Sequence, residues 1–292
     1  MIKLTNSPIE NINFKNFNFL IKRDDLLDID FTGNKARKFQ YFLENSFPDI
    51  NTIISYGSNQ SNAMYSLSVL AKYKNWDFIY YTNHIPTFLQ QNPIGNYKYA
   101  LQNGMQLIIG EYDKTNIPYN KLNTLFVKEG GAIQQSQYGI KILANEIQQY
   151  INQHNLNNLK IFLPSGTGTT ALYLQKYLST TVYTSACVGD EQYLKQQFAE
   201  LEPNEQYHPT ILKKSQKYHF GKLYKQNYIL YKELLQETNI EFDLLYDPIG
   251  FDTLLYNQDI LDINNILYIH QGGIKGNEAM LQRYKRKFNE LY

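Results

Sequence analysis

Short apolar runs alternate with helix-forming segments along most of this 292-residue chain. The runs show little polar alternation, which is typical of strands buried on both faces of a parallel sheet. Candidate strands are 52–56, 78–82, 106–109, 125–127, 160–163, 181–188 and 266–270. Between them, apolar residues such as Ala63, Leu67 and Leu70 recur at helical spacing. Because parallel strands need crossover connections, this alternation predicts an α/β fold built from right-handed strand–helix–strand units.

Composition narrows the class of protein further. Hydrophobic residues make up 43% of the chain and charged residues 19%, as in ordinary globular proteins. The formal net charge is +1, so no strong attraction to nucleic acid or to anionic membranes is expected. We see no apolar signal region and no apolar stretch near the ~20 residues that a membrane span needs. The sequence therefore predicts a cytoplasmic protein, in which the single Cys187 is a buried, inert thiol.

A lysine follows a glycine turn in the segment Thr32-Gly33-Asn34-Lys35. The glycine allows a tight turn, and the residues after it begin a helix with Phe39 on one side. A lysine held at such a junction and partly desolvated loses its proton more easily and can form a Schiff base. Taken alone, the segment favours the ordinary interpretation, in which Lys35 is a solvated surface charge.

Two further segments predict anion sites where a strand meets a helix. Small polar residues fill 55–62, just before the helix that runs from Ala63, and the positive helix end favours a carboxylate or phosphate there. Plain N-capping, which needs only one Ser or Asn, is the alternative. The second segment is Pro-Ser-Gly-Thr-Gly-Thr-Thr at 164–170, whose glycines and hydroxyls predict a phosphate cradle, with a structural turn as the alternative. It matches neither the P-loop nor the dinucleotide-binding pattern.

Paired glycines at 272–273 follow the last predicted strand and would let the backbone approach a ligand closely. The five histidines are scattered without metal-ligand spacing and no cysteine pair exists, so no metal site is expected.

In this order, the four segments resemble the pyridoxal phosphate (PLP)-dependent enzymes typified by 1-aminocyclopropane-1-carboxylate (ACC) deaminase and D-cysteine desulfhydrase. These belong to the tryptophan synthase β-subunit-like group, fold type II. The resemblance extends from about Ile21 to Gly273 and takes in Asn92-Pro93-Ile94-Gly95-Asn96 and Asp247-Pro248. It implies two parallel-sheet domains with PLP in the cleft between them. The smaller domain, 38–156, would be inserted into the larger one, 1–37 and 157–292, and a homodimer is the common assembly.

The resemblance also assigns roles to residues. Lys35 matches the lysine that forms the imine with PLP and shuttles a proton, and Ser61 matches a serine with a role in the chemistry. Cofactor-binding positions are Lys35, Asn34, Asn62, Ser165, Gly166, Thr167, Gly168, Thr169 and Thr170. Substrate-binding positions are Ser58, Asn59, Gln60, Ser61, Asn62, Phe220 and Gly250.

The chain departs from the family pattern at several positions. Phe220 and Gly250 stand where the family carries active-site tyrosines, and Phe251 stands where an acid or a threonine is found. Ala63 and Gln271 replace a His or Gln and a Thr, respectively. Tyrosines that could enter the site in another register are Tyr218, Tyr224 and Tyr246.

The resemblance implies a PLP-dependent lyase or deaminase of a small amino acid, with D-cysteine desulfhydrase-like elimination ahead of ACC ring opening. Because of the departures, a PLP-binding homologue with little or no catalytic activity is the first alternative. The second is an α/β protein that binds another phosphorylated ligand and uses Lys35 only as an ordinary charge.

Overall fold

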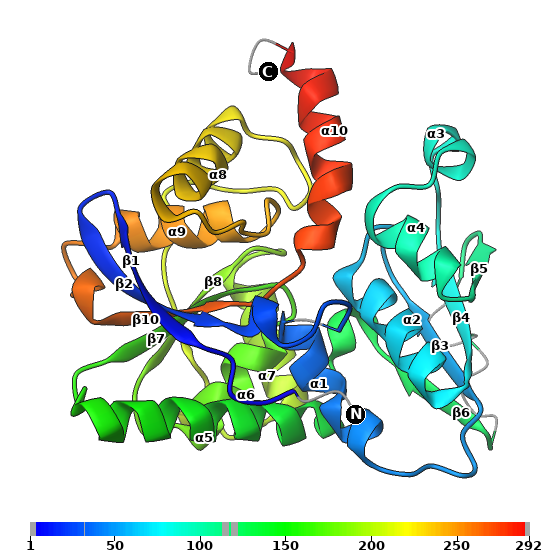
Figure 1. Cartoon of the computed structure of the whole chain (residues 1–292), viewed down its shortest axis with the longest axis horizontal. Coiled ribbons are helices and arrows are strands. Elements are labelled where there is room, and N and C mark those ends of the chain that lie inside the picture. Colours follow the sequence, from blue (N-terminus) through cyan, green and yellow to red (C-terminus); the bar gives the residue numbers. More distant parts are fainter. Residues whose placement is uncertain (1–3, 32, 113–116, 118–121, 290–292) are drawn as a thin grey trace.

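The computed structural model describes residues 4–31, 33–112, 117 and 122–289, and within them it contains two β-sheets (Figure 1). The six-stranded sheet has the order β1-β2-β10-β7-β8-β9 and the four-stranded sheet the order β5-β4-β3-β6. The strands of the larger sheet are β1 (Ile9–Phe14), β2 (Phe17–Arg23), β7 (Lys160–Ser165), β8 (Val182–Ala186), β9 (Thr210–Ile211) and β10 (Ile266–His270). Those of the smaller sheet are β3 (Thr52–Tyr56), β4 (Asp77–Thr82), β5 (Met105–Ile109) and β6 (Thr124–Val127).

All seven predicted strands are confirmed, and neighbouring strands run parallel everywhere except in one pair. The exception is β1, which pairs antiparallel with β2, so the larger sheet is mixed rather than purely parallel as predicted. The sequence pattern did not predict this hairpin or the short edge strand β9. Lys15 and Asn16 connect the hairpin with positive φ angles of 49° and 67°, the geometry of a tight two-residue turn.

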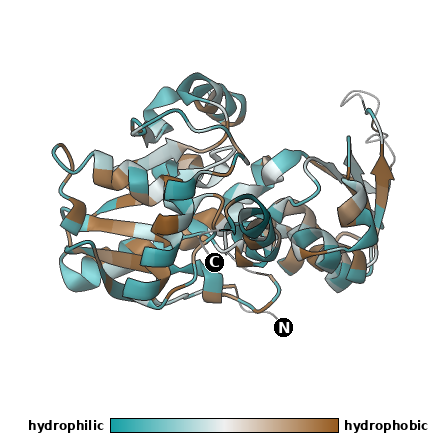
Figure 2. Ribbon diagram, turned by 90° about the horizontal axis from the view of Figure 1, so that it is seen from above, coloured by the Kyte–Doolittle hydropathy of each residue, from teal (hydrophilic) through white to brown (hydrophobic). Residues whose placement is uncertain are grey.

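Helices cover both faces of the larger sheet. On one face, α5 (Gln137–His154) and α6 (Thr169–Tyr177) share an apolar cluster with β7 and β10. On the other face, α8 (Lys225–Thr238) and α9 (Asp247–Tyr256) do the same. Helix α7 (Glu191–Leu201) packs against α6 and β8. Figure 2 shows the apolar central strands enclosed between these helices, as expected where a sheet is buried on both faces.

A separate apolar cluster holds the smaller sheet together with α1 (Gly33–Glu44), α2 (Asn62–Lys74) and α4 (Gly95–Gln102). The short α3 (Thr87–Gln91) precedes α4, and α10 (Asn277–Lys287) is the last helix in chain order among the described residues. The 3-10 turns are Asp24–Leu26, Glu129–Gly131, Gln134–Ser136, Glu205–Tyr207, Ile263–Asn265 and Ile274–Gly276.

The domain ranges 1–37 with 157–292 and 38–156 remain a prediction. Helix α5 lies within 38–156, and its apolar side packs in the core of the six-stranded sheet. The smaller sheet itself is formed by residues 52–127.

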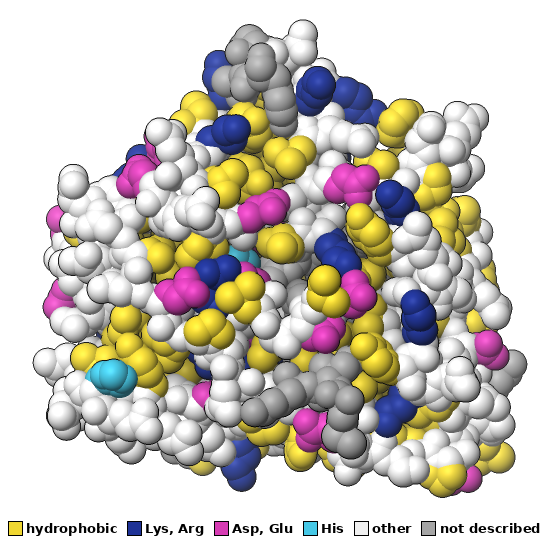
Figure 3. Space-filling view, viewed as in Figure 1, with side chains coloured by type: hydrophobic (Ala, Val, Ile, Leu, Met, Phe, Trp, Pro, Cys, Tyr) yellow, Lys and Arg dark blue, Asp and Glu magenta, His cyan; other side chains and the backbone are white. Residues whose placement is uncertain are grey.

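The single cysteine, Cys187, is fully buried, as predicted. Burial raises the pKa of its thiol to about 12. Within the described residues no helix is long and apolar enough to cross a membrane, and no cluster of three metal-ligating side chains occurs. On the face seen in Figure 3, basic and acidic side chains are interspersed rather than gathered by sign.

Candidate active site

A cavity of about 250 Å³ lies where the two sheets face each other. All four segments singled out in the sequence contribute to its wall: Asn34 and Lys35, part of 58–62, the loop 165–170, and Gln271 with Gly272. Three of these segments directly follow β3, β7 and β10. Ligands of parallel α/β sheets bind at the carboxyl ends of the strands, so this is the expected position for a site.

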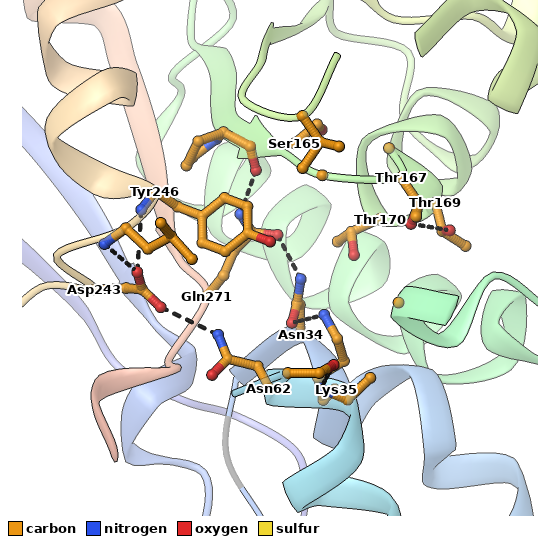
Figure 4. A pocket seen from close by; sticks show the side chains of 18 of the residues that line it. Asn34, Lys35, Asn62, Ser165, Thr167, Thr169, Thr170, Asp243, Tyr246 and Gln271 are labelled. Atoms are coloured by element: carbon orange, nitrogen blue, oxygen red, sulfur yellow. Dashed lines mark hydrogen bonds between the residues drawn. The ribbon is translucent and has the colours of Figure 1, made fainter. Parts of the chain in front are cut away.

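Lys35 lies in the first turn of α1 (Figure 4). The helix begins at Gly33, whose φ is +63° and where a Cβ atom would lie 1.8 Å from the backbone oxygen of Gln271. Only glycine fits there, and Asn34 N–H donates to that same oxygen at 3.0 Å. The start of α1 is thereby fixed against the end of β10. The turn that the sequence predicted thus holds the lysine at the cavity.

The surroundings of Lys35 make its amine easier to deprotonate than that of a free lysine. Burial lowers the pKa of Lys35 from 10.5 to about 8, while the carboxylate of Asp243 acts in the opposite direction. The amine donates to Asn34 Oδ1 at 3.0 Å. Lys38, one turn later, is buried and donates to the backbone oxygen of Gly130 at 2.9 Å. Burial and the neighbouring Lys35 hold the pKa of Lys38 well below its ordinary value.

Gln271 connects the lysine turn to the larger sheet. Its Oε1 accepts from Asn34 Nδ2 at 2.8 Å, and its Nε2 donates to the backbone oxygen of Pro164 at 2.6 Å. The position where the chain departs from the family threonine therefore orients Asn34, and through it the amine of Lys35.

The segment 58–62 faces Lys35 from α2. Ser61 is the N-cap of this helix, and its hydroxyl accepts from the N–H groups of Ala63 and Met64. Asn62 is held on both sides, because its Oδ1 accepts from Asn96 Nδ2 at 2.6 Å and its Nδ2 donates to Asp243 Oδ2 at 3.1 Å. Capping thus occupies Ser61, but it does not account for the fixed amide of Asn62 at the cavity wall.

The residues of this segment line two adjoining cavities. Ser58, Gln60, Ser61 and Asn62 line the cavity beside Lys35, and all residues of the segment except Ser61 line the second cavity. The Nδ2 atom of Asn59 donates to the backbone oxygen of His84 at 2.9 Å.

The loop 165–170 ends in the N-terminus of α6. The first backbone hydrogen bond of this helix runs from Leu172 N to Gly168 O, so the preceding N–H groups have no acceptor within the helix. Thr167 and Thr169 approach each other at 3.2 Å between hydroxyls, and Ser165 Oγ accepts from Thr184. The hydroxyl of Thr170 is buried and has no hydrogen-bond partner in the described part of the chain. Buried polar groups are nearly always hydrogen-bonded, so this hydroxyl indicates a place for a polar ligand.

Asp243 is a site residue that the sequence pattern did not predict. It accepts from the N–H groups of Leu245 and Tyr246 at 2.7 and 3.0 Å and from Asn62, and burial raises its pKa to about 6. The residue lies in the irregular segment between α8 and α9. Its only local signal is that of an ordinary turn-forming aspartate.

The positions that depart from the family pattern lie in two different places, some at the cavity and two in the core. Phe220 lines the cavity and packs on Tyr246, with 5.5 Å between ring centroids. Gly250, expected at the substrate site, instead lies in the interior, where a Cβ would meet Tyr268 Oη at 2.7 Å, and it does not line the cavity. Phe251 is also in the core, stacked on Tyr268.

Of the three tyrosines considered for a shifted register, Tyr246 lines the cavity. In Figure 4 the ring of Tyr246 lies between Asp243 and the threonines of the loop 165–170. Tyr218 donates instead to Asp252, and Tyr224 accepts from the N–H of His219.

No protein-family model and no curated protein matches this chain. Solved structures do match it over its length. A protein described as an ACC deaminase homologue has a TM-score of 0.79 at 21% identity, covering 100% of this chain and 96% of its own. The chain has the fold of the type II PLP-dependent enzymes.

Two further neighbours share this fold. A hydrogen sulfide-producing enzyme from Fusobacterium nucleatum has a TM-score of 0.66 at 13% identity, with 93% of this chain and 97% of that chain covered. An L-serine ammonia-lyase from Rhizomucor miehei has a TM-score of 0.63 at 15% identity, with 98% and 99% covered. At these identities the likeness establishes the fold, and the α/β class predicted from the sequence is confirmed.

The residues of the cavity fit PLP. An amine with a lowered pKa, Lys35, is what an aldehyde requires. The start of α6 offers N–H groups that have no acceptor within the helix and the orphaned hydroxyl of Thr170, which suit a phosphate. The amine and the loop line one cavity, so a single ligand can engage both.

Proposed function

We propose that this chain is a PLP-dependent lyase or deaminase of an amino acid, with D-cysteine desulfhydrase-like elimination from a small substrate ahead of ACC ring opening. One observation carries the proposal: the low-pKa amine of Lys35 shares a cavity with the helix N-terminus that holds the orphaned Thr170 hydroxyl. A solvated surface lysine would not have a lowered pKa. A purely structural turn would not explain a buried hydroxyl without a hydrogen-bond partner.

Each group of residues then has a task. Lys35 would anchor the cofactor aldehyde and, once freed, accept a proton from substrate carbon, for which a pKa near 8 is suited. The loop 165–170 would hold the phosphate. The N-terminus of α2, with Ser61 and the fixed amide of Asn62, would bind the substrate carboxylate. When bound, PLP supplies an electron sink for negative charge at the α or β carbon.

A PLP-binding protein with little or no catalysis is the second candidate. The observation in its favour is that Gly250 and Phe251 lie in the core, so neither supplies a polar group to the cavity. Against it, Tyr246 brings a phenol to the cavity wall. Release of ammonia and keto acid from small D- and L-amino acids favours the enzyme, and complete inactivity of the PLP-loaded protein favours the binding protein.

The cofactor is tested by adding PLP, recording the visible spectrum, reducing with borohydride and locating the adduct by peptide mass. We expect an adduct on Lys35 that is missing from the Lys35→Ala protein. Lys38→Ala is the matched control, because Lys38 is also a buried lysine of α1 with a lowered pKa. An adduct that moves to Lys38, or none at saturating PLP, contradicts the proposal.

The proposal extends to a homodimer, for which the support is the family resemblance alone, and to a cytoplasmic location, for which the support is the sequence pattern described above. Sedimentation velocity of the purified protein tests the assembly directly.

A further inference from the structure

A second cavity of about 470 Å³ adjoins the one that contains Lys35. The residues common to both walls are Ser58, Gln60, Asn62, Phe220, Asp243 and Leu245. The two spaces therefore meet at the place where the proposed function puts the substrate carboxylate. The role of the second cavity rests on that proposed function and concerns the part of the substrate that extends beyond this junction.

Part of the wall of the second cavity is apolar. Phe88 and Leu89 of α3, Ile94 before α4 and Met280 of α10 line it. Such a wall favours a hydrocarbon stem over a solvated polar chain.

Two arginines of α10, Arg283 and Arg286, also line this cavity. Arg283 donates to the backbone oxygen of Gly221 at 2.6 Å, and Arg286 lies 5.0 Å from the ring centroid of Phe88. Among the described residues neither guanidinium forms an ion pair, and the pKa of Arg283 is lowered by burial and by its neighbour Arg286. The acid in the wall, Asp243, belongs to the shared end and is bound there by Asn62.

The backbone positions of the arginines lie further along α10 than the shared end, while the guanidinium of Arg283 reaches back to Gly221, beside Phe220. Asn277, at the start of α10, is fixed beside Asp243, because it accepts from Leu244 N–H and donates to the backbone oxygen of Phe242, both at 2.8 Å. At a rise of about 1.5 Å per residue, Arg283 and Arg286 follow roughly 9 and 14 Å further along the helix. Figure 1 shows α10 leading away from the sheets.

The sizes of the two cavities bear on the substrate. Sites that hold a drug-sized ligand enclose roughly 300–1,000 Å³, whereas the cavity beside Lys35 has about 250 Å³. PLP and a substrate would share that space. A long substrate side chain bound together with PLP therefore has room in the adjoining second cavity.

We propose that the substrates include alanines carrying a long β-substituent with an apolar stem and an anionic end, which Arg283 and Arg286 bind. Guanidinium groups are suited to carboxylates because their donors form charge-assisted hydrogen bonds. The substrate class is thus wider than cysteine itself and includes S-substituted cysteines that end in a carboxylate.

The reaction balances without any oxidant. For an S-substituted cysteine, the Cα–H and Cβ–S bonds break, the thiolate leaves with the electron pair of Cβ–S and takes a proton, and an aminoacrylate remains. Water hydrolyses this product to pyruvate and ammonia. The net change is one cysteine thioether and one water to one thiol, one pyruvate and one ammonia.

The test compares S-carboxypropylcysteine with S-butylcysteine, which differ only in a carboxylate against a methyl group at the far end. Both enantiomers are titrated calorimetrically into the PLP-loaded protein, and pyruvate release gives kcat/KM. We expect the wild type to prefer the carboxylate by about tenfold or more, which corresponds to one charge-assisted hydrogen bond. Arg283→Gln and Arg286→Gln should each reduce this preference, and the double variant should abolish it.

Lys285→Gln is the matched control, because Lys285 is an exposed cation of the same helix and lines neither cavity. It should keep the preference. Equal affinity of the wild type for both ligands, no binding of either, or a preference that survives in the double variant overturns the inference. A visible spectrum taken before the titration distinguishes failure of this inference from failure of the proposed function. If the PLP band is absent, the cofactor assignment fails, but calorimetry still compares the affinities of the two ligands.

Discussion

At the residue scale, Asp243 opposes the burial that lowers the pKa of Lys35 to about 8. An anion stabilises the ammonium form, so Asp243→Asn should lower this pKa further. At pH 7 an amine of pKa 8 is roughly one tenth neutral, so PLP capture in the variant should be faster there by up to about tenfold. The pH dependence of the rate at which the PLP band appears measures this change.

Asp259→Asn is the control for that experiment, because Asp259 is exposed and lines neither cavity. Its capture profile should match that of the wild type. A profile for Asp243→Asn that moves to higher pH would show that Asp243 does not act through its charge on Lys35.

Removing the orphaned hydroxyl of Thr170 should affect stability and PLP binding in opposite directions. Thr170→Val keeps the shape but removes a buried hydroxyl without a partner, so the free energy of unfolding of the PLP-free protein should stay level or rise by about 1 kcal/mol. PLP affinity should fall about tenfold, since a hydrogen bond to a charged group contributes about 1.5–3 kcal/mol. Urea unfolding and PLP titration measure the two effects.

Thr253→Val is the control, because it removes a buried hydroxyl that does have a hydrogen-bond partner. Thr253 is a buried threonine of α9 whose hydroxyl donates to the backbone oxygen of Ile249 at 2.7 Å. This variant should lose stability and keep its PLP affinity. If both threonine variants behave alike, the hydroxyl of Thr170 has no special part in phosphate binding.

At the scale of elements, the start of α6 depends on Gly168. Its φ is +71°, and a Cβ there would lie 2.3 Å from Phe198 Cε1 and 2.6 Å from Leu194 Cδ1, both on α7. Gly168→Ala should therefore cost about 3 kcal/mol, from left-handed backbone and from overpacking, and should weaken PLP binding. Gly104→Ala isolates the backbone part, because φ is +91° there and nothing lies within 4 Å. Equal losses in the two variants would contradict an effect of overpacking at Gly168.

Elements with a strong local pattern were predictable from the sequence. Buried parallel strands such as β7 and β10 are continuous apolar runs, and they appear where expected. The β1–β2 hairpin was missed because it lacks a continuous apolar run: Asn13 and Asn18 alternate with its apolar residues. A signal was nevertheless present, since Lys15-Asn16 is a two-residue connection between alternating apolar positions.

The candidate site was predictable where backbone geometry demands particular residues. The glycine turn before Lys35 and the loop 165–170 follow from such demands, and the structure brings both to one cavity. Asp243 was not predictable, because it reaches Asn62 across 181 positions of the chain and only the packing of α8 and α9 brings them together. Gly250 was expected at the site by alignment, but the turn of α9 directs it to Tyr268.

At the scale of the whole molecule, a buried charge cluster joins segments that are distant in sequence. Arg37 of α1 is fully buried and donates to Asp24 at 2.9 Å and to Glu146 of α5 at 2.8 Å. Lys22 of β2 also contacts Glu146, at 2.7 Å. Two cations thus balance two carboxylates where the lysine-bearing helix meets the larger sheet. The cluster ties α1, and therefore Lys35, to α5 and to β2 of the larger sheet.

Removing the central cation should destabilise the whole fold. Arg37→Leu leaves Asp24 and Glu146 buried with one cation between them, and breaking a buried pair in this way costs about 3–5 kcal/mol. Exposed pairs contribute little, so Lys195→Ala, which breaks the surface pair with Glu191, should leave the free energy of unfolding nearly unchanged. Urea unfolding of both variants measures the difference. Similar small losses would mean that water reaches the cluster and that apolar packing alone holds α1 against the larger sheet.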